Sequence, residues 1–158
     1  MRKLLFGVIL IDQLAKQAVE HFMMPGESIP IIAGVFHLTF VLNPGAAFGI
    51  LENQQWFFIV VALVLIVGAS AFYYKVAREG PFFRYGCMAL VGGAAGNLID
   101  RLTVGTVVDF FDFRVWPVFN IADIAIVLGM ASMVYDIMFS RSGSDASDSG
   151  NGRRGQTA

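Results

Sequence analysis

The chain has 158 residues, of which 56% are hydrophobic and 15% charged, and its mean hydropathy is +0.67. This composition excludes an ordinary soluble protein and favours one membrane-embedded domain. Fifteen Phe with a single Cys exclude a small disulfide-bonded secreted protein, and a net charge of −1 without a basic stripe excludes a nucleic-acid partner.

Positive charge is unevenly distributed along the chain. Lys and Arg gather at its start, between the second and third apolar runs, and after the last run: Arg2, Lys3, Lys75, Arg78, Arg84, Arg141, Arg153 and Arg154. Because positive charge is retained on the cytoplasmic side, both termini and the middle loop are predicted to be cytoplasmic. Residues 23–55 and 101–116 are then predicted to lie outside.

The first expected membrane span covers residues 4–22. Its apolar start resembles a signal peptide, but Asp12 interrupts it and no small-residue cleavage site follows. Asp12 and Lys16 lie one helical turn apart, so the two side chains are expected to pair. The pair either fixes helix packing or supports a nearby polar site, and the residues alone leave both interpretations open.

An outer β region is expected at about 29–50. Apolar and polar residues alternate with a period of two along Phe36, His37, Leu38, Thr39, Phe40, Val41, Leu42 and Asn43, which predicts a strand with one apolar face. Asn43, Pro44 and Gly45 then predict a turn. Because a strand with open edges cannot cross a bilayer, this region is predicted to lie on the outer surface.

The second and third spans are expected at 56–74 and 81–100. The second contains nineteen residues without charge, with Trp56 at its start and a Tyr pair at its end, as in helices that end at membrane interfaces. The third is rich in Gly and Ala, which favours close helix packing. Asn97, Asp100 and Arg101 follow at its outer end, and an Asp beside an Arg there is more often structural than catalytic.

The fourth span is expected at 117–139 and runs inward. Asn120 is a plausible helix N-cap, and Asp123 then lies in the first turn, where the helix dipole favours a carboxylate. That is the structural interpretation of Asp123. Asp136 is expected at the inner end among lipid headgroups. Residues 140–158 are rich in Ser and Gly and predict a disordered cytoplasmic tail after a single membrane domain at 1–139.

A chain that leaves and re-enters the membrane brings several Asp residues to its outer face. Asp109 and Asp123 are separated by the turn at Pro117, so they can approach each other. Two adjacent carboxylates share a proton, and such a pair hydrolyses a peptide bond without a metal or a cofactor. The chain lacks H-E-x-x-H and G-x-S-x-G motifs, so carboxylate pairing is one remaining option.

At these residues the sequence resembles the lipoprotein signal peptidase family, also called signal peptidase II. The resemblance rests on four blocks in the family's order: D-Q-L-A-K at 12–16, N-P-G-A-A-F at 43–48, G-N-L-I-D-R with V-V-D-F within 96–111, and F-N-I-A-D at 119–123. It implies an all-α membrane protein with four transmembrane helices and a small extracytoplasmic β-sheet cradle. Each block is a weak signal, but the four together in this order are highly specific.

The resemblance also implies an activity and a site. The family's catalytic aspartates fall on Asp109 and Asp123. Its supporting or substrate-binding residues fall on Asp12, Lys16, Asn43, Gly45, Asn97, Arg101 and Asn120. The implied activity is cleavage of diacylglyceryl-modified bacterial prolipoproteins just before the lipidated Cys, at the outer side of the cytoplasmic membrane, by a monomer in contact with membrane lipid. Globomycin-type inhibitors block the family, and no metal or cofactor is expected.

Two other functions remain compatible with the residues. Membrane carboxylates also serve proton- or cation-coupled transporters, so a small four-span transporter is the main alternative. A transporter is expected to hold its carboxylate near the middle of the membrane, whereas these acids crowd one face. The second alternative is a non-enzymatic assembly subunit in which every Asp serves packing.

Overall fold

The structure is a computed structural model that describes residues 2–45 and 54–140. The helices are α1 (Arg2–Phe22), α2 (Gln55–Ala71), α3 (Tyr73–Val76), α4 (Pro81–Thr103), α5 (Ile121–Tyr135) and the π-helix η2 (Asp136–Ser140). The strands are β1 (Ser28–Ile32), β2 (Phe36–Asn43) and β3 (Val107–Asp112). The end of the expected outer β region, part of the N-P-G-A-A-F block and the expected tail beyond 140 lie outside the described residues.

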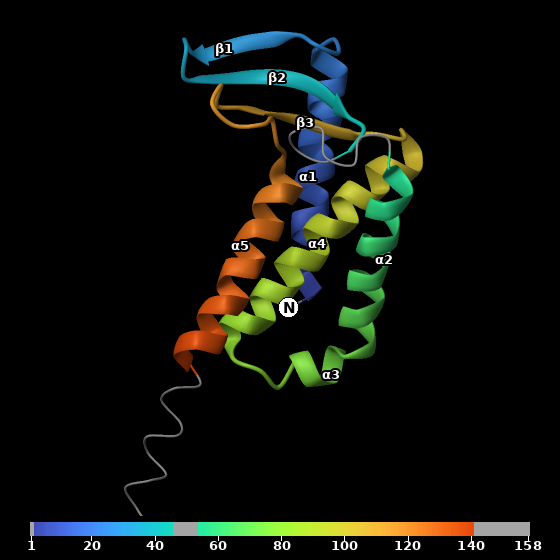
Figure 1. Cartoon of the computed structure of the whole chain (residues 1–158), viewed down its shortest axis with the longest axis vertical. Coiled ribbons are helices and arrows are strands. Elements are labelled where there is room, and N and C mark those ends of the chain that lie inside the picture. Colours follow the sequence, from blue (N-terminus) through green and yellow to red (C-terminus); the bar gives the residue numbers. More distant parts are fainter. Residues whose placement is uncertain (1, 46–53, 141–158) are drawn as a thin grey trace, which may run out of the picture.

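The sheet lies at one end of a group of helices (Figure 1). Helix α4 is at the centre and packs against α1, α2 and α5. Strand β3 is the strand nearest the helices, and the start of α1 and the end of η2 lie at the opposite end (Figure 1). The molecule therefore has the sheet at one end, and the first and last described residues lie at the other.

Small residues on α4 let its neighbours approach closely, as the sequence predicted. A Cβ added to Gly86 would lie 2.6 Å from the carbonyl oxygen of Gly129 in α5. Gly92 faces α1, where an added Cβ would lie 3.1 Å from the Leu5 carbonyl oxygen. These close approaches let α4 contact α1 and α5 on different faces, which positions the polar residues at the end of α4 next to the sheet.

The predicted strand is confirmed as β2, the middle strand of a three-stranded antiparallel sheet in the order β1-β2-β3. The sequence did not predict β3, whose register with β2 shifts between Leu38 and Val41 and places Val41 opposite Asp109. A cluster of Val19, Met23, Phe40, Val108 and Phe110 joins the underside of the sheet to α1. Strand β3 is thus buried between β2 and the helices.

Two expected helix boundaries were wrong. The helix expected over 56–74 ends at Ala71, where the Ser70 hydroxyl donates to the Ile66 carbonyl at 2.8 Å, a bond that favours helix bending. The helix expected from Pro117 begins only at Ile121. Residues 117–120 precede it, and Phe119 pairs with Phe111 in an isolated β-bridge.

Asp136 corrects a further expectation. It is 3% exposed rather than placed among headgroups. Its carboxylate lies against Gly80, before the first turn of α4, where an added Cβ would be 2.5 Å from the Asp136 carboxylate oxygens and would displace that side chain. Asp136 therefore belongs to the packing between the start of α4 and the end of α5.

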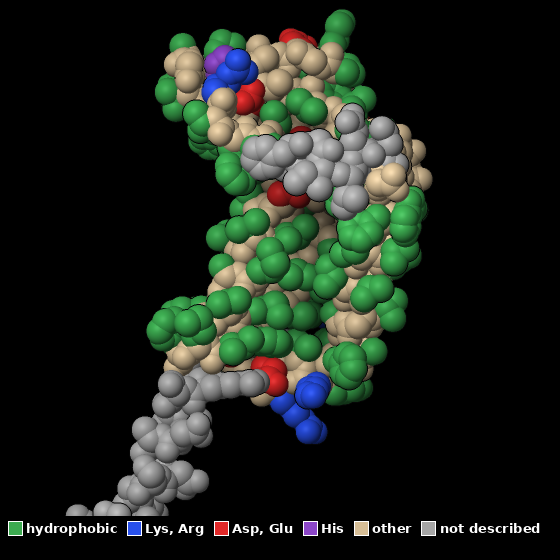
Figure 2. Space-filling view, viewed as in Figure 1, with side chains coloured by type: hydrophobic (Ala, Val, Ile, Leu, Met, Phe, Trp, Pro, Cys, Tyr) green, Lys and Arg blue, Asp and Glu red, His purple; other side chains and the backbone are tan. Residues whose placement is uncertain are grey.

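Within the described residues, one helical segment, Ile121–Phe139, is long and apolar enough to cross a membrane by itself. Helix α2 is apolar but shorter, and α1 and α4 carry buried charged residues. Hydrophobic side chains cover most of the helical part of the face seen in Figure 2, whereas the visible charged side chains gather toward its two ends. The helical part therefore presents an apolar surface between two polar ends.

Candidate active site

Asp109 lies in β3 and is 2% exposed. Its carboxylate accepts hydrogen bonds from two side-chain amides, Asn43 Nδ2 at 2.8 Å and Asn120 Nδ2 at 2.7 Å. Asn43 is oriented by the turn that follows β2, because its Oδ1 accepts from the Gly45 backbone N–H at 3.0 Å. The sheet and the turn predicted at 43–45 thus hold Asp109 between neutral donors.

Asp123 lies at the third position of α5. It forms a capping box with Asn120: the Asp123 N–H donates to Asn120 Oδ1 at 2.9 Å, and the Asn120 N–H donates to Asp123 Oδ2 at 3.2 Å. Asn97 Nδ2 donates to the other Asp123 oxygen at 2.8 Å. The capped helix start predicted from Asn120 and Asp123 is therefore confirmed, and it leaves the half-buried Asp123 carboxylate facing a cavity.

Asp109 and Asp123 line one cavity of about 400 Å³, and Asn120 is hydrogen-bonded to both carboxylates. We call these two residues the acid pair. The other cavity walls come from the end of β2 and the turn after it, α2, α4, the start of β3, the segment before α5, and α5: Asn43, Gly45, Phe58, Val61, Ala62, Leu65, Ala94, Asn97, Arg101, Val107, Trp116, Pro117, Val118, Phe119 and Ile126. Two acids thus share a mostly apolar space.

Among the described residues that line this cavity, Arg101 carries the positive charge. Its Nη1 donates to the Asn97 backbone carbonyl at 3.3 Å, and its guanidinium lies 4.8 Å from the Phe58 ring centroid. Within the described ranges it has no carboxylate within 4.0 Å. Its charge therefore faces the cavity without being neutralised by a direct ion pair.

The environment of Asp109 favours its protonated form. Burial and, second, the charge of Asp123 raise the pKa of Asp109 to about 7, against the opposing effect of the Asn43 and Asn120 hydrogen bonds. Neither acid of the pair has a cation within ion-pair distance among residues 2–45 and 54–140. A proton can therefore be held by the pair near neutral pH.

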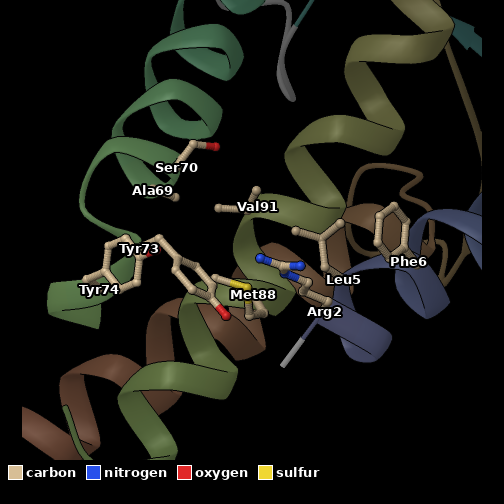
Figure 3. Close-up of a pocket in the computed structure, with 9 residues that line it drawn as sticks. All are labelled: Arg2, Leu5, Phe6, Ala69, Ser70, Tyr73, Tyr74, Met88 and Val91. Carbon is tan, nitrogen blue, oxygen red and sulfur yellow. The ribbon is translucent and has the colours of Figure 1, made fainter. Parts of the chain in front are cut away.

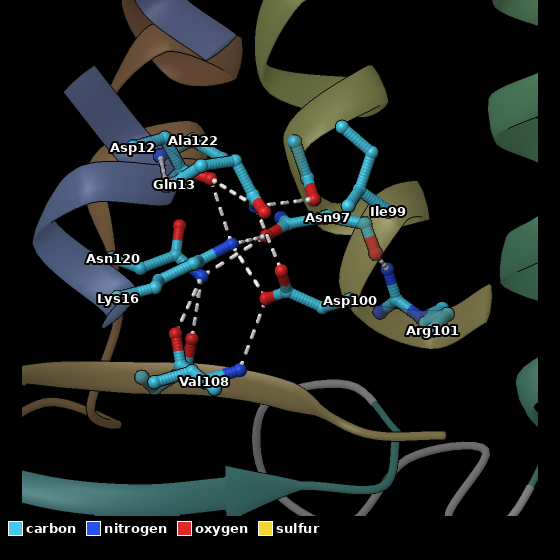
Figure 4. A network of polar contacts seen from close by, with 12 residues as sticks. Asp12, Gln13, Lys16, Asn97, Ile99, Asp100, Arg101, Val108, Asn120 and Ala122 are labelled. Atoms are coloured by element: carbon cyan, nitrogen blue, oxygen red, sulfur yellow. Dashed lines mark hydrogen bonds and ion pairs between the residues drawn. The ribbon is translucent and has the colours of Figure 1, made fainter. Parts of the chain in front are cut away.

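A second buried polar group, drawn in Figure 4, is linked to the acid pair through Asn97. Lys16 Nζ is 2.9 Å from Asp12 Oδ2 and 2.7 Å from Asp100 Oδ2, and all three residues are buried. We call these three residues the lysine cluster. The predicted pairing of Asp12 with Lys16 is confirmed, and the interpretation of Asp100 as a structural residue fits its ion pair.

The lysine cluster is connected to the elements that carry the acid pair. Asp12 Oδ1 accepts from the Ala122 N–H at 2.9 Å in the first turn of α5. Asp100 Oδ2 accepts from the Val108 N–H at 3.2 Å, one residue before Asp109. Lys16 Nζ donates to Asn97 Oδ1 at 2.9 Å, which leaves the Asn97 amide nitrogen for Asp123. The cluster therefore orients both sides of the site.

Seven of the nine candidate residues chosen from the sequence lie in the acid pair or the lysine cluster or are hydrogen-bonded to one of them, and the other two, Gly45 and Arg101, line the cavity. Sequence reasoning missed Gln13, whose Nε2 donates to Asp100 Oδ1 at 2.8 Å and to the Gly96 carbonyl at 3.2 Å. It also missed Phe58 and Trp116 as cavity walls. A glutamine in a helix, or an aromatic residue in an apolar stretch of sequence, carries no signal of such a role, because its partners are distant in sequence.

The arrangement has the parts needed for acid–base hydrolysis. One ionised carboxylate can take a proton from water while a protonated one donates a hydrogen bond to a carbonyl oxygen. Among the described side chains, no group of three or more His, Cys, Asp or Glu is placed to hold a metal ion. The chemistry that the two carboxylates can supply is proton transfer.

Known proteins share this sequence and fold. The model of the signal peptidase II family matches residues 4–139. A lipoprotein signal peptidase of Pelotomaculum thermopropionicum is 47% identical over 131 residues, covering 83% of this chain and 86% of the relative. One from Halothermothrix orenii is 50% identical over 127 residues, covering 80% and 87%.

A solved bacterial membrane enzyme has the same fold, with a TM-score of 0.79 at 28% identity, covering 98% of this chain and 92% of that one. The family match, the identities and the shared fold agree with the resemblance inferred from the four motifs. The chain therefore belongs to the signal peptidase II family of aspartic peptidases.

Proposed function

We propose that Asp109 and Asp123 are the catalytic residues with which this enzyme removes the signal peptide of a diacylglyceryl-modified prolipoprotein, just before the lipidated Cys. The observation that carries this proposal is their placement on one cavity, where both are held by neutral N–H donors and joined through Asn120. Acids in such an environment can gain and lose protons during turnover, whereas acids paired with a cation remain ionised.

The proposed reaction is hydrolysis of the peptide bond by water, with one proton shared between the two carboxyl groups. Asp109, whose pKa is raised to about 7, holds the proton at rest and donates a hydrogen bond to the scissile carbonyl. Asp123 takes a proton from water, and the resulting hydroxide adds to the carbonyl carbon. Collapse of the tetrahedral intermediate breaks the C–N bond while a proton passes to the leaving amine. Arg101 lines the cavity and offers N–H donors to substrate carbonyl groups.

The enzyme belongs to the bacterial inner membrane. We infer that α1, α2, α4 and α5 with η2 are its four spans, that both termini are cytoplasmic, and that the sheet is extracytoplasmic. In support, the helical part presents an apolar surface, and the cations Arg2, Lys3, Lys75, Arg78 and Arg84 belong to the ends of helices opposite the sheet (Figures 1 and 2). The site then opens at the outer face.

This orientation is testable by cysteine labelling. Ser28 in β1 and Lys75 in α3 are exposed at opposite ends, whereas the single native Cys87 is buried. In cells with a permeable outer envelope, a membrane-impermeant maleimide should label Ser28→Cys and not Lys75→Cys. Labelling of Lys75→Cys alone would reverse the proposed topology. Detergent solubilisation should make both sites reactive, which controls for exposure.

The catalytic assignment is tested by Asp109→Asn and Asp123→Asn, with Asp112→Asn as a control on the same strand. Asp112 accepts from Thr39 and Arg114 and does not line the cavity. Each substitution in the acid pair should lower kcat by about 10²–10⁴-fold, the usual contribution of acid–base catalysis, in a protein whose melting transition shows that it still folds. A gel-shift assay on a diacylglyceryl precursor measures kcat. Near-normal turnover by either variant would refute the assignment.

We further infer that a globomycin-type cyclic peptide occupies the same cavity and that the enzyme acts as a monomer. The inhibitor should stop the gel shift and should protect Trp116, a cavity residue that is 60% exposed, from an aqueous fluorescence quencher. The transporter alternative has no support from the comparisons, and the acid pair lies near the sheet rather than midway along the helices.

A further inference from the structure

A second cavity lies far from the sheet, between the start of α1 and the junction of α2 with α3 (Figure 3). Its volume is about 360 Å³, within the usual size of small-ligand sites. The walls are mostly apolar and aromatic side chains from α1, α2, α3 and α4: Leu5, Phe6, Ala69, Tyr73, Tyr74, Met88 and Val91. The cavity shares no lining residue with the one that holds the acid pair.

Arg2 places one positive charge on this apolar space. Its guanidinium lies 5.4 Å from the Tyr73 ring centroid, and Figure 3 shows it between Tyr73 and Leu5. Among residues 2–45 and 54–140, Arg2 has no carboxylate partner and no side-chain hydrogen bond. Stacking on a ring leaves the N–H donors at the edge of the guanidinium available to an acceptor.

The hydroxyl of Ser70, another residue of the wall, is already satisfied. The Ser70 hydroxyl donates to the Ile66 carbonyl, so it offers no open donor to a ligand. Glu79 and Asp136 are acids of the same end of the molecule, and neither lines the cavity. The cavity therefore combines an apolar interior with one unneutralised cation at its rim.

We propose that this cavity binds one anionic phospholipid, with an acyl chain between α1 and α2 and its phosphate on the Arg2 guanidinium. Phosphate oxygens are the acceptors that a guanidinium binds best, and the apolar walls match a hydrocarbon chain. Lys3, Lys75 and Arg78 belong to the same end and attract anionic lipid to it without lining the cavity. The bound lipid holds together the ends of α1 and α2.

The test is native mass spectrometry of the full chain in neutral detergent, titrated with phosphatidylglycerol or phosphatidylcholine of the same acyl chains. The unchanged protein should bind one phosphatidylglycerol roughly fivefold or more tightly than phosphatidylcholine, the preference expected of one well-placed arginine. Arg2→Gln should abolish this preference. Lys3→Gln, which removes the adjacent exposed charge outside the cavity, should change it less than about twofold.

A second pair of variants tests the acyl-chain site. Ala69→Phe fills the cavity and should weaken binding of both lipids, whereas Val67→Phe places the same side chain at an exposed position of α2 and should not. Equal binding of the two lipids by the unchanged protein, equal effects of Arg2→Gln and Lys3→Gln, or unaltered binding by Ala69→Phe would each overturn the proposal. Melting temperatures verify folding, and no step depends on peptidase activity.

Discussion

The acid pair and the lysine cluster are two buried groups of carboxylates with opposite surroundings. Asp12 and Asp100 in the lysine cluster each contact an ammonium group within 3 Å, and neither lines the cavity. Asp109 and Asp123 accept only from amide N–H donors and line it. Burial alone therefore does not identify a reactive carboxylate. The charge of its partner and its access to the cavity distinguish the two groups.

The largest effect is expected where the lysine cluster loses its cation. Lys16→Met leaves Asp12 and Asp100 buried without a countercharge, which should cost about 3–5 kcal/mol of unfolding free energy. Chemical unfolding in detergent measures this loss of unfolding free energy. Lys3→Met is a control at an exposed position of the same helix. Adding Asp12→Asn and Asp100→Asn should restore part of the stability. A Lys16→Met protein as stable as the unchanged one would contradict this account.

The acid pair should make stability and activity depend on pH. The pKa of Asp109 is raised from 3.8 to about 7, so its stabilising contribution is complete below about pH 4 and is lost as pH rises through 7. Between pH 4 and 8, the titration of this group should lower the unfolding free energy of the unchanged protein by on the order of 4 kcal/mol. Asp109→Asn should not show this decrease. The rate of cleavage should also fall as pH rises through 7.

Thermal unfolding at a series of pH values, compared between the unchanged protein and Asp109→Asn, isolates this group from the other titrating residues. Because two close carboxylates titrate together, the kinetic profile reports the pair rather than one residue. Parallel pH dependences of the two proteins would show that Asp109 is not the group responsible.

Asp100→Asn should lower stability more than activity. The substitution removes the ion pair with Lys16 but keeps an oxygen for the Val108 N–H, so β3 and Asp109 should stay in place. The unfolding free energy is expected to fall by about 2 kcal/mol, less than for Lys16→Met, because Lys16 keeps its contact with Asp12. Turnover per folded molecule should stay within about threefold. An inactive variant with an unchanged melting temperature would instead assign Asp100 a direct role.

The smallest effect is expected at Asn43, one of the two donors to Asp109. Asn43→Ala should reduce turnover about tenfold at neutral pH and move the alkaline limit of activity to higher pH, because the lost hydrogen bond favoured the ionised carboxylate. Thr39→Ala on the same strand removes a donor to Asp112 instead and should leave the pH profile unchanged. Equal shifts in both variants would contradict the role given to Asn43.

Local patterns predicted the features that depend on neighbours in sequence. The alternation from Phe36 to Asn43 predicted β2, and the spacing of Asn120 and Asp123 predicted a capped helix start. Strand β3 lacked such a pattern because it is buried nearly throughout, so its residues do not alternate. The bonds from Gln13 and Val108 to Asp100 were not predictable, because each joins segments whose approach depends on the whole fold.

The tight glycine contacts along α4 bear on drug resistance. A side chain at Gly93 would collide with the Ala122 carbonyl, and one at Gly96 would lie 2.5 Å from an Asp12 carboxylate oxygen. The first collision displaces the first turn of α5, which carries Asp123, and the second displaces the Asp12 carboxylate that accepts from the Ala122 N–H in that turn. Changes at either glycine should therefore disable the enzyme before they exclude an inhibitor. A compound that contacts the α4 and α5 walls rather than Phe58 and Val61 of α2 should therefore leave the bacterium fewer viable escape mutations.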